Sequence, residues 1–171
     1  MEASVGAGHI AIKLAGVLNT LSTETHLVVH QDHFLRTFDP TIYKTLSNWA
    51  KHTDIKIHKK SKDVKVEGTK GQMLTIEVDT LIWAIGRHAN TKGLGVEELG
   101  VKLDKKGDIV TNEWQKSNVK GILAIGDVQG RALLTPVAIA AGQRLSNRLF
   151  GPPKFKNDKL SYENIPTVVF S

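Results

Sequence analysis

Apolar and polar positions at the start of the chain follow strand and helix periods in turn. Ala3, Ser4 and Val5 suit a strand, although an ordinary strand has about five residues. A glycine-rich turn follows, and after it apolar residues recur at helical spacing, which predicts an amphipathic helix. These residues are Ile10, Leu14, Val17, Leu18 and Leu21. Residues 26–29 then predict a second strand, so the order is β-turn-α-β with a short first strand.

The next segment predicts a helix followed by strands. Asp39 and Pro40 begin the helix, and its apolar face carries Ile42, Leu46, Trp49 and Ala50. Residues 54–58, 64–67 and 74–78 alternate apolar and polar positions, and Gly68 and Gly71 bracket a turn between the last two. This pattern predicts an antiparallel meander with one solvated face. Residues 80–85 are more uniformly apolar and predict a buried strand that ends at Gly86 and Arg87.

The C-terminal half predicts fewer regular elements. Residues 88–107 are rich in loop-forming residues, and residues 109–111 and 122–125 predict short strands. Thr135 is a suitable N-cap for a helix over residues 136–150, which stops at Gly151. Residues 166–171 predict a last strand. The whole pattern predicts an α/β protein with a Rossmann-like domain.

Composition narrows the function classes. The chain has 171 residues, 40% of them hydrophobic, and no apolar run approaches the roughly 20 residues of a membrane span. The net charge is +6, but the lysines are scattered. Their densest group is Lys56, Lys59, Lys60, Lys62 and Lys65. Because no aromatic residues alternate with them, a solvated face is favoured over a nucleic-acid surface, and we expect neither a nucleic acid nor a membrane as partner.

The absence of cysteine excludes a disulfide, a thiolate nucleophile and a cysteine metal site within these residues. The seven histidines lack metal-ligand spacing with a carboxylate, so no metal site is expected. No serine elbow or paired carboxylates stand out either, so no catalytic residue is assigned. Redox chemistry would have to run through a bound cofactor or a partner chain.

The glycine turn predicts a dinucleotide site. Gly6, Gly8, His9, Ile10 and Ala11 match the pattern G-x-G-x-x-G/A, in which backbone N–H groups approach a pyrophosphate.

The residues after the second strand bear on which dinucleotide binds. An NAD-selective unit usually places an acid there for the ribose 2′-hydroxyl. This chain has His30 and Arg36 instead, and Arg36 can hold a 2′-phosphate through two hydrogen bonds. The pattern favours NADP(H), and the alternative is that both are ordinary loop residues. Arg87, at the end of a predicted strand, either faces the dinucleotide or is a surface loop residue.

Residues 124–145 predict a second ligand site. Asp127 follows an apolar strand and would accept hydrogen bonds from a ribityl or ribose hydroxyl, and the helix start at Thr135 would stabilise negative charge on a flavin ring. The alternative is a capped helix after an ordinary turn, with Asp127 as a turn residue.

Six strings of the chain together resemble the FAD- and NADPH-dependent disulfide reductases. They are GAGHIAIKLAG, LRTFD, LIWAIGR, NVKGILAIGDV, ALLTPVAIAAGQRLSNRLFG and YENIPTVVFS. LIWAIGR and LLTPVAIAAG favour the branch that reduces glutathione disulfide over dihydrolipoyl dehydrogenases, while trypanothione and thioredoxin reductases remain closer alternatives.

The resemblance implies three segments: residues 1–87 as an NADPH-binding domain, 88–159 as the completion of an FAD domain, and 160–171 as the start of an interface domain. It implies that Arg36 binds the 2′-phosphate, Asp127 the ribityl chain and Thr135 the isoalloxazine ring. It also places Gly86, Leu133 and Val168 along the NADPH path. His9 and His30 stand where the family usually has a tyrosine and an arginine.

The resemblance further implies FAD and NADPH as cofactors, and glutathione disulfide as substrate of an intact, homodimeric enzyme in the cytoplasm or, alternatively, the mitochondrion. The family's first FAD fingerprint and cysteine pair would precede Met1, and its catalytic histidine and glutamate would follow Ser171. We therefore expect a fragment that is inactive alone. A stand-alone NADP(H)-binding module and a non-catalytic fragment that pairs with another chain are the alternatives.

Overall fold

A computed structural model describes residues 1–30, 32–35, 38–60 and 76–169. The chain divides into two compact units. The first comprises Met1–Gly86 together with Thr167–Ser171, and the second comprises Arg87–Pro166.

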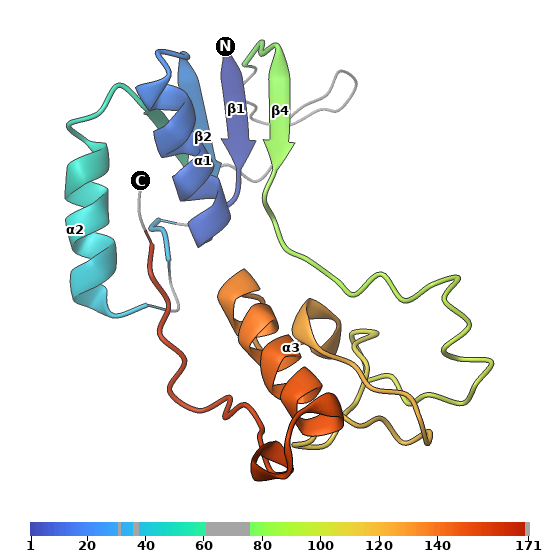
Figure 1. The fold of residues 1–171 in the computed structure, drawn as a ribbon. Helices are drawn as coiled ribbons and strands as arrows, with labels where there is room; N and C mark the ends of the chain where they lie inside the picture. The colour runs from blue at the N-terminus through green and yellow to red at the C-terminus, as the bar shows by residue number, and fades with distance from the viewer. Residues whose placement is uncertain (31, 36–37, 61–75, 170–171) are drawn as a thin grey trace. The chain divides into compact units, whose positions relative to one another are not determined.

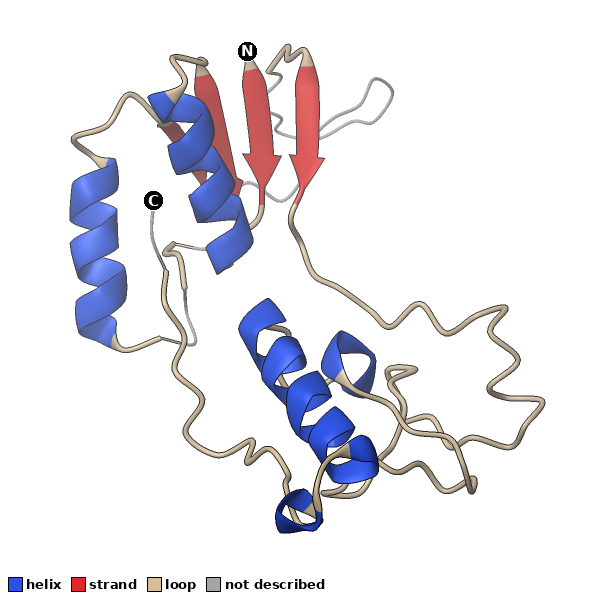
Figure 2. Ribbon diagram, viewed as in Figure 1, coloured by secondary structure: helices blue, strands red, loops and turns tan. Residues whose placement is uncertain are grey.

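The first unit is built on a parallel sheet (Figures 1 and 2). Its strands are β1 (Glu2–Val5), β2 (Thr25–Val29), β3 (Lys56–Lys59) and β4 (Thr80–Trp83), in the order β3-β2-β1-β4. Helix α1 (His9–Thr20) connects β1 to β2, and helix α2 (Pro40–Ala50) lies between β2 and β3 in the chain. The predicted β-turn-α-β order and the Rossmann-like α/β fold are confirmed.

The buried face of α1 consists of three small residues and Ile12. Ala11, Ile12 and Ala15 pack with Leu27 and Val29 of β2 in the core. The prediction that Val17 and Leu21 belong to the inner face is wrong, since both are exposed, Leu21 by 69%. Alanines let the helix backbone approach the sheet closely, so the larger residues lie to the side.

Helix α2 begins as its sequence predicts. The Asp39 carboxylate accepts a hydrogen bond from the Thr41 backbone N–H at 2.8 Å, which satisfies one of the unpaired donors of the first turn. Ala50 is buried in the core and Leu46 packs against it. Ile42 and Trp49 remain exposed, so the buried face is narrower than predicted.

The predicted antiparallel meander is wrong at its first strand. β3 pairs in parallel with β2, with Ile57 opposite Leu27. The α2 crossover returns the chain to the same edge of the sheet, so β3 runs in the direction of β2. The predicted strand 64–67 and residues 74–75 lie outside the described residues, and residues 76–78 form no strand.

The segment 80–85 forms a strand but is not buried. β4 ends at Trp83, which is 55% exposed, and Ile85 is 70% exposed. Within the described sheet β4 pairs only with β1, so it is an edge strand. A uniformly apolar run does not distinguish such an edge from a central strand.

The second unit has its own small core of Val101, Ile109 and Ala124. Its helices are η1 (Gly126–Gln129), α3 (Thr135–Phe150) and η2 (Pro153–Phe155). The strands predicted at 109–111 and 122–125 are reduced to isolated bridges, Leu103 with Ile109 and Lys116 with Leu123. Tight turns reverse the chain inside each pair, so one residue pair forms and the chain then diverges.

The ends of the second unit depart from the predictions in detail. Helix α3 ends at Phe150 as predicted, and Gly151 after it is extended. A Cβ at Gly151 would lie 2.4 Å from the Asn147 carbonyl oxygen, so this position requires glycine for space. The predicted last strand is absent from residues 166–169, and residues 170 and 171 lie outside the described residues. Val169 packs instead against the core of the first unit.

Across the described part of the chain, the helices are too short or too polar to cross a lipid bilayer.

Candidate functional site

The turn between β1 and α1 is fixed by Gly6. Its φ of +148° is one that side chains rarely adopt, and a Cβ there would lie 2.4 Å from the Ala84 carbonyl oxygen. The Gly6 N–H donates to the Val28 carbonyl oxygen at 3.0 Å. The turn therefore passes between the ends of β2 and β4, and only glycine fits at this position.

The first turn of α1 follows directly. Gly8 is the N-cap, is exposed, and has open space where a Cβ would lie. The described residues provide no side-chain cap, and the first turn carries no acidic residue. Its backbone N–H groups and the positive end of the helix dipole are thus available to an external anion. This arrangement fits the pyrophosphate of a dinucleotide.

Four of the residues predicted to bind NADP lie close to this turn in the fold. His9 and Ile10 are half-buried in the first turn of α1. His30 is exposed directly after β2, and Gly86 is exposed three residues after β4, with a φ of +147°. Because β1, β2 and β4 are parallel, their carboxyl ends share one edge of the sheet. Ligands of open α/β sheets bind at this edge.

Two contacts near this edge have no signal in the sequence pattern. The Leu35 N–H donates to the Ala7 carbonyl oxygen at 2.9 Å, which ties the loop after β2 to the glycine turn. Lys60 lies 3.1 Å from the Asp32 carboxylate, so an ion pair joins the same loop to the end of β3. Arg36, the predicted 2′-phosphate ligand, lies outside the described residues. Val168 is exposed in the terminal segment of the first unit.

A hollow in the second unit brings together three residues predicted for two different cofactors. It has a volume of about 150 Å³ and is lined by Arg87, Asp127 and Leu133, among others. The Arg87 Nε lies 3.9 Å from an Asp127 carboxylate oxygen, with both side chains largely exposed. Since ligand pockets usually enclose about 300–1,000 Å³, this hollow can hold only part of a cofactor.

The start of α3 lies beside Asp127. Gly126 has a φ of +74°, and a Cβ there would lie 3.2 Å from the Ala138 Cβ, so η1 packs closely on the first turn of α3. The prediction that Thr135 is the N-cap is wrong. Leu134 takes that place because its carbonyl oxygen accepts from the N–H groups of Val137 and Ala138, and Thr135 is already helical. The predicted functional contact of Thr135 with a flavin stays a prediction.

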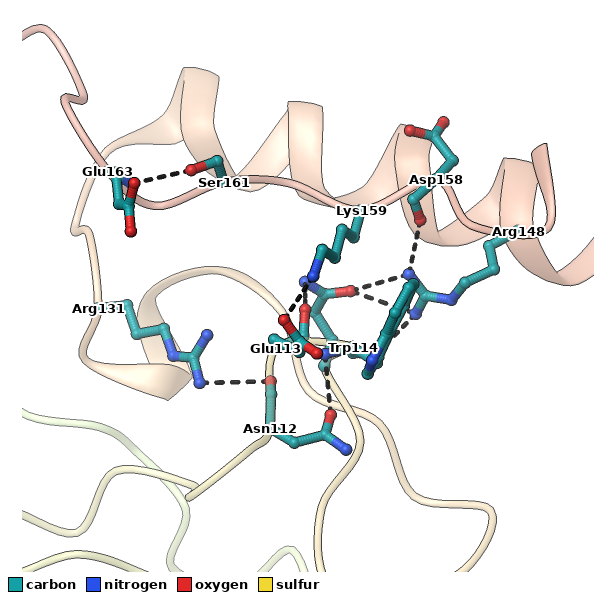
Figure 3. Close-up of polar contacts among 10 residues, drawn as sticks. Asn112, Glu113, Trp114, Arg131, Arg148, Asp158, Lys159, Ser161 and Glu163 are labelled. Atoms are coloured by element: carbon teal, nitrogen blue, oxygen red, sulfur yellow. Dashed lines mark hydrogen bonds and ion pairs between the residues drawn. The ribbon is translucent and has the colours of Figure 1, made fainter.

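A cluster around Trp114 fixes the other end of α3 (Figure 3). Arg148 donates to the Trp114 carbonyl oxygen at 2.6 Å and to the buried Gln115 carboxamide oxygen at 3.2 Å. Its guanidinium lies 5.5 Å from the Trp114 ring centre, and the Lys159 ammonium lies 4.7 Å from it. Lys159 also pairs with Glu113 and holds the pKa of that carboxyl below its usual value. This cluster is structural, and its residues are too far apart in the sequence to be predicted together.

Comparison with known proteins identifies the family of this chain. The profile of the pyridine nucleotide-disulphide oxidoreductases matches residues 3–142. The chain belongs to this family. Members use a nicotinamide cofactor together with FAD, and the resemblance expected from the sequence is confirmed.

Individual relatives support the same family assignment. The chain is 46% identical to the glutathione reductase of Schizosaccharomyces pombe, over 99% of this chain and 38% of that protein. The HOCl-induced flavoprotein disulfide reductase RclA from Escherichia coli superposes with a TM-score of 0.79 at 20% identity, over 98% of this chain and 39% of that one. A Cu(II) complex of the same reductase gives a TM-score of 0.77 at 19% identity, over 88% of this chain and 36% of that one. This chain thus spans less than two fifths of the length of these relatives.

Proposed function

We propose that the chain supplies the NADP(H)-binding part, and one side of the FAD site, of a glutathione-disulfide reductase. The observation that carries the proposal is the Gly6 turn with the open start of α1, in a chain that is 46% identical to a glutathione reductase. Within this reading the pyrophosphate of NADPH binds at the first turn of α1. His30 and Arg36 accompany the 2′-phosphate, and Gly86, Arg87, Leu133 and Val168 line the path of the dinucleotide.

The FAD side is proposed at the hollow of the second unit. Asp127 accepts a hydrogen bond from the ribityl chain, and the start of α3 at Thr135 faces the isoalloxazine ring. When both cofactors are bound, NADPH supplies a hydride that the flavin accepts. Arg87 holds the Asp127 carboxylate in place while that ligand is bound.

The thiol steps need groups from outside these residues. The 171 residues contain no cysteine, so reduction of glutathione disulfide cannot be completed by their side chains. We propose segments 1–87, 88–159 and 160–171 as parts of the NADPH, FAD and interface domains of a homodimeric enzyme located in the cytoplasm or mitochondrion. The chain alone is then inactive toward glutathione disulfide.

A titration followed by nicotinamide fluorescence tests the binding half of the proposal. The expected result is saturable binding of NADPH that is at least tenfold tighter than binding of NADH. Arg36→Ala should remove most of that preference, whereas the matched control Arg144→Ala, on α3 of the second unit, should leave it unchanged. No saturable binding at millimolar NADPH would overturn the proposal.

A second candidate function is a stand-alone NADP(H)-binding module, favoured by the separate core of the first unit and by the parallel sheet of its described residues. A turnover assay distinguishes these two hypotheses, the inactive part of a reductase and the binding module, from a self-sufficient enzyme. We expect NADPH binding but no glutathione formation when NADPH, FAD and glutathione disulfide are added to the chain. Formation of glutathione would show that the proposed inactivity is wrong.

A third candidate, a fragment that pairs with another chain, is favoured by exposed apolar residues on α3. Ile139 and Leu149 are about half exposed and Phe150 is 84% exposed. Such residues commonly mark a surface that another element covers. Light scattering should then report an assembly, and a well-folded monomer at all concentrations would contradict this reading.

A further inference from the structure

Two histidines on neighbouring strands of the first unit meet end to end. His26 of β2 and His58 of β3 lie with Nδ1 and Nε2 3.0 Å apart, and their ring planes differ by 6°. The ring centres are 5.2 Å apart, which exceeds the N···N distance by about one ring width. The rings therefore share a plane and face each other through one nitrogen each, which is the geometry of an N–H···N hydrogen bond.

The sheet register holds this pair in place. His26 is opposite Lys56, and His58 is opposite Val28, so the two histidines lie on the same face and are diagonal neighbours. His26 is 6% exposed and His58 is half-buried. A hydrogen bond between them requires a proton on one facing nitrogen and a lone pair on the other.

The charged groups that face the pair can be named strand by strand. Next to His26, β1 contributes Ala3 and β3 contributes Lys56. Before β2, the Glu24 carboxylate lies 3.6 Å from the far nitrogen of His26 and also pairs with Lys56. On the far side of β1, β4 contributes Leu81 opposite Ala3. In the described part of the sheet, Glu24 and Lys56 are thus the charges beside the pair.

We propose that His26 and His58 form a proton-gated clamp between β2 and β3, closed by one shared proton and opened when both facing nitrogens are protonated. In the closed state either ring can be the donor. Once acid has protonated both rings, both facing nitrogens carry protons and neither can accept, so two cationic rings face each other at hydrogen-bond distance. The repulsion is relieved when the two rings move apart.

The burial of His58 and the groups beside it also disfavour its protonated form, as the clamp requires. Burial, followed by the neighbouring His26 and Lys56, lowers the pKa of His58 below its ordinary value of 6.5. A lowered pKa in the folded state means that the unfolded chain binds more protons there. The contribution of His58 to stability is therefore present above pH 6.5 and is lost as the pH falls below it.

Opening of the clamp should affect strand β3 before the other strands. Within the described sheet β3 pairs only with β2, whereas β1 is held on both sides by β2 and β4. Loss of the histidine bond therefore loosens β3 first. A metal site is a poor alternative, since the described residues offer no third ligand around the pair and the two nitrogens already bond to each other.

Hydrogen exchange of the whole chain tests the clamp. Exchange rates of the β3 and β1 amides are measured between about pH 8 and pH 5, the interval in which histidines titrate, and corrected for the intrinsic pH dependence. We expect protection of the β3 amides to fall about tenfold for each unit by which the folded pKa lies below the unfolded one, while β1 protection changes little. A parallel loss in both strands, or no loss in either, would overturn the proposal.

Two histidine variants, and the ¹⁵N resonances of the wild-type histidine rings, complete the test. His58→Gln keeps a neutral hydrogen-bonding group and should abolish the selective loss in β3, whereas His52→Gln, at an exposed histidine after α2, should retain it. If His58→Gln does not fold, ¹⁵N shifts of the wild-type rings decide. Protonation of His58 that also moves the His26 ring resonances at the same pH supports the clamp, and protonation of His58 that leaves the His26 resonances unchanged contradicts it.

Discussion

At the scale of single residues, backbone geometry identifies the turn that the sequence pattern only suggests. The pattern G-x-G-x-x-G/A does not distinguish its two glycines, but the structure does. At Gly6 an added methyl group would strike the Ala84 carbonyl oxygen, whereas at Gly8 it would meet open space. The first glycine is required by the fold, and the second is available for a ligand.

Gly6→Ala should therefore destabilise the chain by about 1–3 kcal/mol, because the new Cβ is both strained at positive φ and in contact with backbone. Urea unfolding measures the loss. Gly8→Ala is the matched control and should change the free energy of unfolding little while weakening NADPH binding. Equal destabilisation by both variants would show that the turn is described wrongly.

Asp39 gives a pH-dependent prediction at the same scale. The Thr41 N–H bond holds the pKa of Asp39 below its ordinary value of 3.8. A lowered pKa means that this contribution to stability is present above pH 3.8 and is lost as the pH falls below it. Asp39→Asn keeps a capping oxygen but cannot titrate, so its unfolding midpoint should fall less than that of the wild type on acidification. Identical acid dependence would contradict the capping role.

At the scale of elements, helices are predicted better than strands, for physical reasons. α2 and α3 carry local signals, Asp39 with Pro40 and Gly151, that are read within a few residues. Strand pairing depends on partners far along the chain, so the direction of β3 and the exposure of β4 could not be read from alternation alone. Residues 109–111 and 122–125 have strand-like composition but lack a partner that continues past one bridge.

The Trp114 cluster gives the prediction for an element. Arg148 joins α3 to the loop before it and to the segment after it, through Trp114, Gln115 and Asp158. Arg148→Ala leaves the oxygen of the buried Gln115 carboxamide without its Arg148 donors and should cost about 1–3 kcal/mol in urea unfolding. Arg144→Ala, on the same helix with a more exposed ion pair to Asp158, should cost clearly less. A larger loss for Arg144→Ala would contradict the cluster's role.

At the scale of the whole molecule, two separate cores predict two regions of stability. Ile12 is central to the first core and Ile109 to the second. Ile12→Ala and Ile109→Ala remove buried methyl groups worth about 2–5 kcal/mol. Hydrogen exchange should show each loss mainly in the unit that contains the substitution. Equal spread over both units would indicate one cooperative core.

The sequence located most of the candidate site but not its internal arrangement. The shared edge of β1, β2 and β4 gathers Gly6, Gly8, His30 and Gly86, which were predicted from motifs placed along the chain. The hollow that brings Arg87, Asp127 and Leu133 together was not predicted, because its lining comes from turns without periodic pattern. The family assignment also came from strings of residues, since composition alone admits many soluble α/β proteins.

Titration of the ¹⁵N-labelled chain with NADPH, followed through its backbone amide resonances, tests the central claim most directly. If the start of α1 binds the dinucleotide, the amides of Gly6, Gly8, His9 and Ile10 should shift together and saturate, and the same amount of NADH should shift them less. Absence of saturable shifts at these amides, with or without shifts elsewhere in the chain, would contradict the account.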